Sequence, residues 1–307
     1  MMERSFLVAA ARDTIARGSQ SFAAASRLFA PETRERAWLL YAWCRAADDM
    51  TDGQELGHGA AAVHDPLAAQ AQLQALTDLA LDSDAEVPLP FAALRQVARE
   101  TAIPRRFIAD HLAGFALDAA DWRPRSEDDL LRYCYHVAGS VGCMMAVVMG
   151  VPPGDEDTLD RACDLGLAFQ LANIARDVVP DAVVGRCYLP SAWLVRFGLR
   201  ENDLADPANR AAVAEMAARL VRMARPYRQS ARVGAARLPF RSRLAVLAAD
   251  GIYGAIGEKV RDLGPAAWDE RVRIGSGGKL ALLGQAMLRG LARPASTPRT
   301  DLWQRPL

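Results

Sequence analysis

The sequence lacks an excess of charge of either sign. Its 307 residues include 37 lysines and arginines against 37 aspartates and glutamates, so the formal net charge is zero. Proteins that bind nucleic acids usually present a basic face, and this composition gives no support for one. We therefore expect no nucleic-acid partner, although the balance does not exclude a local basic pocket for a phosphate group.

Long apolar runs and paired cysteines are also absent. The most apolar stretch, 137–151, is too short to span a bilayer and is interrupted by glycines. The five cysteines include no CxxC pair, which favours buried, reduced thiols over a zinc site or disulfides. The first sixteen residues lack the apolar core of a signal peptide. We expect a cytoplasmic protein; peripheral contact with the inner membrane and the oligomeric state stay open.

Strand signals are scarce as well. Alternating β-branched runs are hard to find, whereas Ala, Leu, Arg and Glu dominate, and prolines and glycines fall between periodic segments. We predict an all-α protein of about ten helices. The clearest are 33–51, 67–81, 90–101, 104–120, 127–150, 155–179, 208–235, 240–262 and 278–292. Nothing marks a second domain, so we predict a single domain over 1–292 and an irregular tail over 293–307.

Two acidic segments carry the functional signal. In the first, Asp48 and Asp52 are four residues apart and share one helix face, with Arg45 three residues before Asp48. Like charges at this spacing destabilise a helix by a few tenths of a kcal/mol unless a cation holds them. Mg²⁺ is a hard cation that suits carboxylates, water and phosphate oxygens. Taken alone, the pair fits a solvated helix end as well as it fits a metal site.

The second segment changes that balance. Gln170, Asn173 and Asp177 are spaced three and four residues apart and form a polar stripe on an otherwise apolar helix. Burying polar groups is costly unless they meet partners. Two such stripes facing each other across a cavity would make a metal and diphosphate site. Arg45 and Arg176 could then grip phosphate oxygens with their guanidinium forks.

With these segments in place, the chain resembles the squalene/phytoene synthase family over nearly its whole length, and in particular its members from bacterial carotenoid pathways. The motifs that carry the resemblance follow the family's order: GSQSF (18–22), YAWCR (41–45), DDMTD (48–52), YCYHVAGSVG (133–142), FQLANIARDVVPD (169–181), GRCYLP (185–190) and LWQRPL (302–307). No single motif is specific, but the combination is. The resemblance implies an isoprenoid synthase-type helical bundle with a central apolar cavity.

The resemblance also implies roles for individual positions. The positions that match metal-binding residues are Asp48, Asp52, Asn173, Asp177 and, as a further acid, Asp181. The positions that match diphosphate-binding or pocket residues are Ser19, Ser21, Tyr41, Arg45, Gln170, Arg176, Tyr188 and Tyr253. The positions that match the channel wall are Tyr133, Val137, Ala138 and Gly142, although ordinary core packing explains any one of them at least as well. We expect the catalytic residues to be Arg45, Asp48, Asp52, Asp177 and Tyr253.

The reaction implied is a head-to-head condensation of two geranylgeranyl diphosphates, through prephytoene diphosphate, to phytoene with release of diphosphate. It would require Mg²⁺, with Mn²⁺ as a substitute, and no NADPH. Three alternatives stay open: dehydrosqualene or squalene synthesis from farnesyl diphosphate, a chain-elongating prenyltransferase, and a non-catalytic family member acting as an assembly factor. The chain-elongating enzymes lack the Gln170–Asp177 pattern, and assembly factors tend to lose acids that both segments here retain.

One position departs from the family pattern. Pro180 stands where an acidic residue is usual. Because proline lacks the N–H that would bond to the carbonyl of Arg176 and crowds the preceding turn, we expect the helix to kink or end there. Asp181 would then be the least secure of the metal ligands.

Overall fold

The computed structural model describes residues 2–52, 65–292 and 297–306, apart from the side chains of Gln20, Ser21 and Asp52. Within these ranges there is no β-strand, so the prediction of an all-α fold is confirmed. Every range predicted to be helical contains a helix. The α-helices are α1 (Arg4–Gly18), α2 (Gln20–Ser26), α3 (Pro31–Asp52), α4 (Pro66–Asp82), α5 (Leu89–Thr101), α6 (Arg105–Ala119), α7 (Glu127–Cys134), α8 (Ser140–Val148), α9 (Glu156–Val183), α10 (Ser191–Phe197), α11 (Arg210–Ala235), α12 (Phe240–Leu263) and α13 (Ser276–Leu291).

Capping residues set where the functional helices begin. The Ser126 side chain accepts a hydrogen bond from the backbone N–H of Asp129, and the Asp129 carboxylate accepts one from the backbone N–H of Ser126, which starts α7. Asp155 likewise accepts from the backbone N–H of Thr158 and starts α9. Such caps satisfy N–H groups that have no partner in a first helical turn. They fix the start of α9, which carries the second acidic segment.

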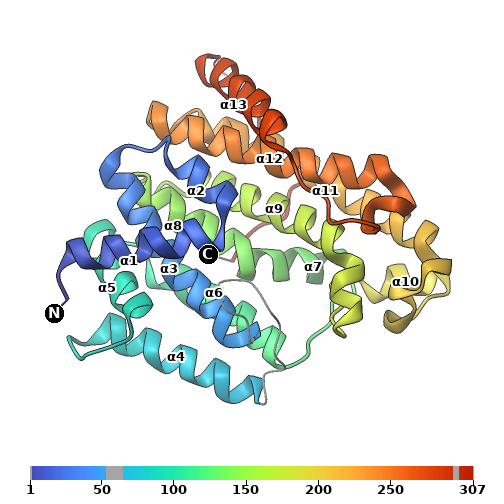
Figure 1. Ribbon diagram of the computed structural model, residues 1–307, viewed down its shortest axis with the longest axis horizontal. Helices are drawn as coiled ribbons and strands as arrows, with labels where there is room; N and C mark the ends of the chain where they lie inside the picture. Colours follow the sequence, from blue (N-terminus) through green and yellow to red (C-terminus); the bar gives the residue numbers. More distant parts are fainter. Residues whose placement is uncertain (1, 53–64, 293–296, 307) are drawn as a thin grey trace.

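Helix α9 lies at the centre of the bundle (Figure 1) and packs most extensively against α11, with further contacts to α8 and α12. A π-helical turn, Tyr135–Gly139, joins α7 to α8 and crosses close to α9. A Cβ atom at Gly142 would collide with the carbonyl oxygen of Ala162, and one at Gly166 with that of Ala138. Glycine at both positions therefore lets the two backbones touch.

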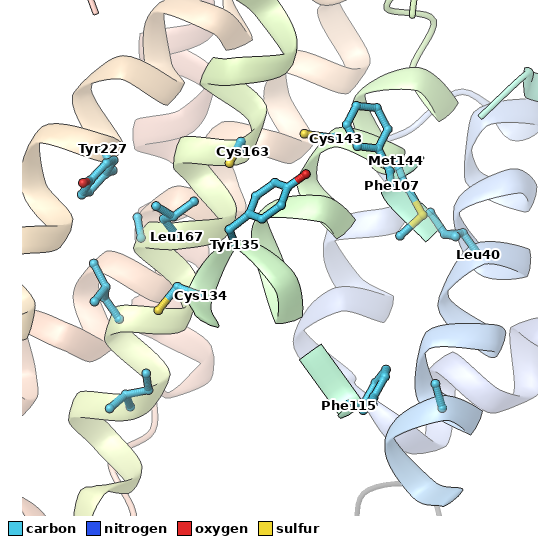
Figure 2. Packing of buried hydrophobic residues seen from close by; sticks show 14 of the residues in the cluster. Leu40, Phe107, Phe115, Cys134, Tyr135, Cys143, Met144, Cys163, Leu167 and Tyr227 are labelled. Atoms are coloured by element: carbon cyan, nitrogen blue, oxygen red, sulfur yellow. The ribbon is translucent and has the colours of Figure 1, made fainter. Parts of the chain in front are cut away.

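The thiols sit in the core, as predicted. All five cysteines are free, and four of them are buried. Figure 2 shows Tyr135 lying between Cys143 on α8 and Cys163 on α9, with Leu167 one turn further along α9. The hydroxyl of Tyr135 donates to Asp110 on α6 at 2.5 Å, which gives this buried phenol a polar partner.

Pro180 does not end the second acidic helix. Helix α9 runs through Pro180 to Val183, so that part of the expectation is wrong. The proline stands only three residues before the end of the helix, and its side chain is exposed. In the last turn of a helix, the N–H that proline lacks removes one hydrogen bond to a carbonyl, and water can bond to that carbonyl instead. The helix is therefore not broken, as it would be by a proline in its interior. Asp177 and Asp181 therefore keep their spacing of four on one helix.

The C-terminal segment 297–306 has no helix, but it is fastened to the first half of α9. Arg299 donates to both carboxylate oxygens of Asp164 at 2.8 Å, and the side chain of Asp164 is fully buried. The Arg305 side chain is also fully buried and donates to Asp160 at 2.7 Å and to Glu156. These pairs join residues 135 to 149 positions apart in sequence.

Candidate active site

A cavity of 350 Å³ lies inside the bundle, between α2, α3, α8, α9, α11 and α12. Most of its wall is apolar. The larger apolar side chains that line it are Phe22, Phe29, Val137, Val141, Met145, Met149, Leu165, Phe169, Leu238, Val246 and Ile252. The polar side chains that line it include Tyr41, Asp48, Gln170, Asn173 and Tyr253. The structure thus brings Asp48 of the first predicted stripe and Gln170 and Asn173 of the second to one cavity, whereas Asp177 is not among the described residues that line it.

The cavity extends a long way from these polar groups. Asn173 and Thr158 both line it and stand fifteen residues apart on α9, which is about 22 Å of helix. At the Thr158 end the wall includes Arg161, whose guanidinium donates to the carbonyl of Thr297 at 2.9 Å and to Asp157 at 3.1 Å. The charged groups at this end are therefore bonded to each other and to the C-terminal segment.

On α3, one arginine serves two acids. Arg45 Nε donates to Asp49 Oδ1 at 3.0 Å, and its Nη2 lies 3.4 Å from Asp48 Oδ2. Asp48 lines the cavity and its side chain is 41% exposed, so it is open to a ligand. Sequence reasoning assigned Asp49 no role, although it lies beside Asp48 in the motif. The side chain of Asp52, predicted as the second acid of this face, lies outside the described residues.

On α9, Asp177 lies in the fork of the neighbouring guanidinium. Arg176 Nε donates to Asp177 Oδ1 at 2.9 Å, and Arg176 Nη2 donates to Oδ2. Arg271 Nη2 lies 3.7 Å from the same Oδ2. Asn173, one turn earlier, and Gln170, two turns earlier, face the cavity. Arg271 was missed from the sequence, because it lies in a loop 94 residues after Asp177 and only the fold brings the two together.

Two tyrosines stand beside these charges. Burial raises the pKa of Tyr41 to about 12, with Arg45 opposing the shift. Burial also raises the pKa of Tyr253, against the influence of Arg176. The Tyr253 ring stacks on Phe169, with centroids 4.1 Å apart. Both phenols are therefore protonated at neutral pH, and both line the cavity.

Of the two predicted serines, only Ser19 has a described side chain. The Ser19 hydroxyl accepts a hydrogen bond from the backbone N–H of Phe22 at 3.3 Å and so caps the N-terminus of α2. This role explains the serine without a ligand, and it holds α2 where Phe22 reaches the cavity wall. The side chain of Ser21 lies outside the described residues.

The predicted channel-wall residues, together with the predicted pocket residue Tyr188, divide into two groups. Val137, Ala138 and Gly142 line the cavity. Tyr133 and Tyr188 are not among the described residues that line it. Instead their rings stack with centroids 4.8 Å apart, and their hydroxyls lie 3.1 and 3.3 Å from the carboxylate of Asp118.

Asp118, near the end of α6, thus accepts hydrogen bonds from two tyrosine hydroxyls, and the sequence analysis did not identify it. Burial, reinforced by the negative charge of Asp118, raises the pKa of both tyrosines. The charge of Arg186 lowers the pKa of Tyr188 and that of Asp181 raises it, so this cluster lies near the last turns of α9. No local pattern around Asp118 could have revealed it, since its partners come from α7 and from the loop after α9.

The donor set suits a metal ion that arrives with a phosphate ligand. Among the described residues, no three His, Cys, Asp or Glu side chains gather closely enough to hold an ion by themselves. Asp48 on α3 and Asn173 on α9 instead offer hard oxygen donors to the cavity, and Asp177 lies one turn beyond Asn173 on α9. Mg²⁺ usually takes one or two carboxylates and completes its shell with water and substrate phosphates. The residues present therefore fit it.

Known proteins resemble this chain in sequence and in fold. The profile of the squalene/phytoene synthase family matches residues 15–277. A 15-cis-phytoene synthase from Enterobacter agglomerans is 49% identical over 300 residues, which cover 94% of this chain and 99% of that protein. A 15-cis-phytoene synthase from Pantoea ananas is 47% identical over the full length of both chains. A crystal structure of a dehydrosqualene synthase in complex with a ligand superposes with a TM-score of 0.81 at 26% identity, covering 92% of this chain and 96% of that one.

Proposed function

Because the chain belongs to the squalene/phytoene synthase family, we propose that it acts as a phytoene synthase. It joins two geranylgeranyl diphosphates head to head, through prephytoene diphosphate, to phytoene and releases diphosphate, a step of carotenoid biosynthesis. The observation that carries this proposal is the cavity itself. One long apolar chamber has acidic and amide side chains from two helices at the same end, next to two arginines.

The diphosphate group would bind at this polar end. Arg45 and Arg176 donate hydrogen bonds to Asp49 and Asp177, and their guanidinium groups can turn to phosphate oxygens when substrate arrives. The residues that would hold Mg²⁺, or Mn²⁺ in its place, are Asp48, Asp52, Asn173, Asp177 and Asp181. When bound, the ion stabilises the negative charge that develops on the departing diphosphate. Arg271, 3.7 Å from Asp177, adds a further positive charge at the same place.

Loss of diphosphate leaves an allylic cation, and the chamber protects it. The apolar wall excludes water that would trap the cation as an alcohol. Tyr41 and Tyr253 stay protonated, so neither presents a phenolate that would attack it. The faces of Phe22, Phe169 and Tyr253 offer π-electron density to a positive charge. The double bond of the second substrate is then the nucleophile that remains.

Chain length distinguishes the proposed substrate from the main alternative. A dehydrosqualene or squalene synthase would use farnesyl diphosphate, which is one isoprene unit shorter. The cavity follows α9 for about 22 Å from Asn173 to Thr158, and the small side chains of Ala138 and Ala162 line it along the way. This length favours the C20 substrate.

The deciding experiment supplies geranylgeranyl and farnesyl diphosphates separately to the purified protein, with Mg²⁺, with and without NADPH, and identifies the products. We expect phytoene from the C20 substrate, formed without NADPH and lost in excess EDTA. Equal or better use of the C15 substrate would make the protein a dehydrosqualene synthase. No product from either substrate would favour the assembly-factor alternative.

The site of action follows from the chemistry of the product. Phytoene is a C40 hydrocarbon that leaves the protein for lipid rather than water. No helix in the described part of the chain is both long and apolar enough to cross a membrane. We propose a cytoplasmic enzyme in peripheral contact with the inner membrane.

A further inference from the structure

Helix α13 has two apolar faces, and the bundle covers one of them. Ala286 and Gly290 are buried against α12, where a Cβ atom at Gly290 would lie 2.6 Å from Leu244. Leu283 packs against the same cluster, which also holds Leu247 of α12. Figure 1 shows α13 at the outer edge of the molecule, with α12 between it and the rest of the bundle.

The other apolar face is exposed. Leu280, Leu288 and Leu291 are 70, 72 and 71% exposed, and Met287 is 43% exposed. Their spacings of seven, eight and eleven residues place all four on one side of the helix. Among the described residues, twelve large apolar side chains are exposed, and these four are the only ones that share a helix face in this way. We call them the α13 stripe.

The charged residues of α13 have one sign. The helix carries Lys279 and Arg289 and no acidic residue, and Arg273 lies in the loop just before it, although the whole chain is neutral. Arg273 and Arg289 are exposed. The first turn of α12, which bonds to the end of α13 through Arg243 Nη1 and the Gly290 carbonyl at 3.1 Å, adds the exposed Phe240.

We propose that the α13 stripe docks the protein on the surface of an anionic lipid bilayer. A helix with an apolar face, basic residues as its only charges and an aromatic ring at the margin is what such an interface takes up. Sixteen residues make a helix of about 24 Å, which is shorter than the hydrocarbon core, so α13 would lie in the plane of the interface.

A second copy of the chain is a poorer occupant for this face. A twofold contact through α13 would set the same patch against itself, and because the helix has basic but no acidic residues, it would offer its copy no opposite charge. Anionic lipid headgroups supply the missing charge, whereas a second copy does not.

The position of α13 also connects docking with the reaction, a point that rests on the proposed function. Val246 of α12 lines the cavity and packs against the cluster that holds Ala286 of α13. The docking face is thus one helix away from the chamber in which a hydrocarbon product forms. A hydrocarbon leaving beside α12 would enter lipid without crossing water.

The test is flotation of the purified full-length chain with vesicles of phosphatidylcholine alone or mixed with phosphatidylglycerol. We expect binding to the anionic vesicles that weakens as salt is raised. The double substitution Leu288→Gln and Leu291→Gln should lower partitioning at least tenfold, and Arg289→Gln about fivefold. Leu67→Gln is the matched control, because Leu67 is a leucine of similar exposure (63%) on α4, on the opposite side of the bundle (Figure 1).

Other outcomes would overturn the proposal. Binding by the double variant that equals that of the unaltered chain would show that lipid does not contact the α13 stripe. Equal binding of the unaltered chain to vesicles with and without phosphatidylglycerol would show that anionic headgroups do not contribute to docking. A dimer in solution that the double variant converts to monomer, with no flotation, would identify a second copy as the occupant. Flotation needs no turnover, so a chain that floats but makes no phytoene refutes only the proposed function.

Discussion

The carboxylate of Asp177 is held by its immediate neighbour, Arg176, through hydrogen bonds from Nε at 2.9 Å and from Nη2. Side chains one residue apart on a helix leave its surface about 100° apart, so this pair forms only because both chains bend toward each other. The arginine keeps a partly buried carboxylate neutralised until a better partner is present. Metal and diphosphate together would separate the pair, since each offers one of the two groups a stronger partner.

The first prediction tests Asp177 as a metal ligand. Asp177→Asn keeps the size of the side chain but removes its charge, and we expect the rate to fall by about a thousandfold or more at saturating Mg²⁺. Single-turnover product formation measures the effect, with circular dichroism to show that the fold is kept. Asp262→Asn is the control, because that carboxylate is 64% exposed and pairs with its neighbour Arg261. Retention of more than a tenth of the rate by Asp177→Asn would contradict the assignment.

The second prediction compares Asp181 with Asp177. Pro180 gave reason to treat Asp181 as the weaker ligand, but α9 continues past it to Val183 and keeps the two acids four residues apart on one helix. We therefore expect Asp181→Asn and Asp177→Asn to lower kcat by factors that agree within tenfold. Both variants are measured at saturating Mg²⁺. A much smaller loss for Asp181→Asn would restore its secondary role.

The third prediction concerns stability in acid. Burial of Glu100 opposes its ionisation, but hydrogen bonds from Arg4, Gln96 and Arg36 outweigh that effect and lower its pKa from 4.5 to about 2. The unfolded chain therefore takes up this proton first as pH falls. The stabilisation is complete above about pH 5 and is lost as the pH falls toward 2.

Urea denaturation of Glu100→Gln at pH 7, 5 and 3 tests this. The variant should be less stable by about 1–2 kcal/mol at pH 7, after allowance for solvent screening at the partly exposed Arg4, and should lose less stability than the unaltered chain toward pH 3. Glu32→Gln, at a site 69% exposed, should change stability by less than about 0.5 kcal/mol at each pH. Parallel acid profiles for Glu100→Gln and the unaltered chain would refute the role of Glu100.

The placements at the cavity wall that the sequence predicted are those that repeat along one helix. The spacing of Gln170 and Asn173 places both on the cavity side of α9, and the same regularity brings Asp48 to the wall. Helix periodicity is a local property, so a sequence reveals it. Pro180 shows the limit of the method, because a rule for helix interiors was applied to a residue in the last turn.

The parts that escaped prediction depend on pairs distant in sequence. Asp118 meets Tyr188 across 70 positions, and Arg299 meets Asp164 across 135. Neither acid lies in a local pattern that distinguishes it from a surface carboxylate. The C-terminal prolines indicate irregular backbone, but not that this backbone would bury two arginines against α9.

The fourth prediction uses that tail. Asp164 is fully buried and receives two hydrogen bonds from Arg299. Arg299→Met would leave a buried carboxylate without its partner, which costs about 3–5 kcal/mol. Denaturant unfolding should show that loss, whereas Arg200→Met, at a site 88% exposed, should change stability by less than about 0.5 kcal/mol. An Arg299→Met protein as stable as the unaltered chain would mean that the tail does not hold α9 in solution.

The last prediction tests whether the far end of the cavity sets substrate length. Ala162 lines the cavity one turn of α9 from Thr158, at the end away from Asn173. Phenylalanine at this position would fill about one turn of helix length, roughly 5 Å. The terminal isoprene unit of a C20 chain would lose that space, while a C15 chain would stop short of it.

Ala162→Phe should therefore lower kcat/KM for geranylgeranyl diphosphate at least tenfold and leave that for farnesyl diphosphate within about threefold. A displaced five-carbon unit forfeits about 0.8 kcal/mol for each buried methylene, so tenfold is a conservative limit. Ala162→Ser, which adds little volume, should leave the ratio of the two kcat/KM values unchanged, and thermal unfolding of both variants checks for overpacking in the core. Equal losses for the two substrates would show that the chain does not follow α9 to Thr158, and the C20 preference would then need another origin.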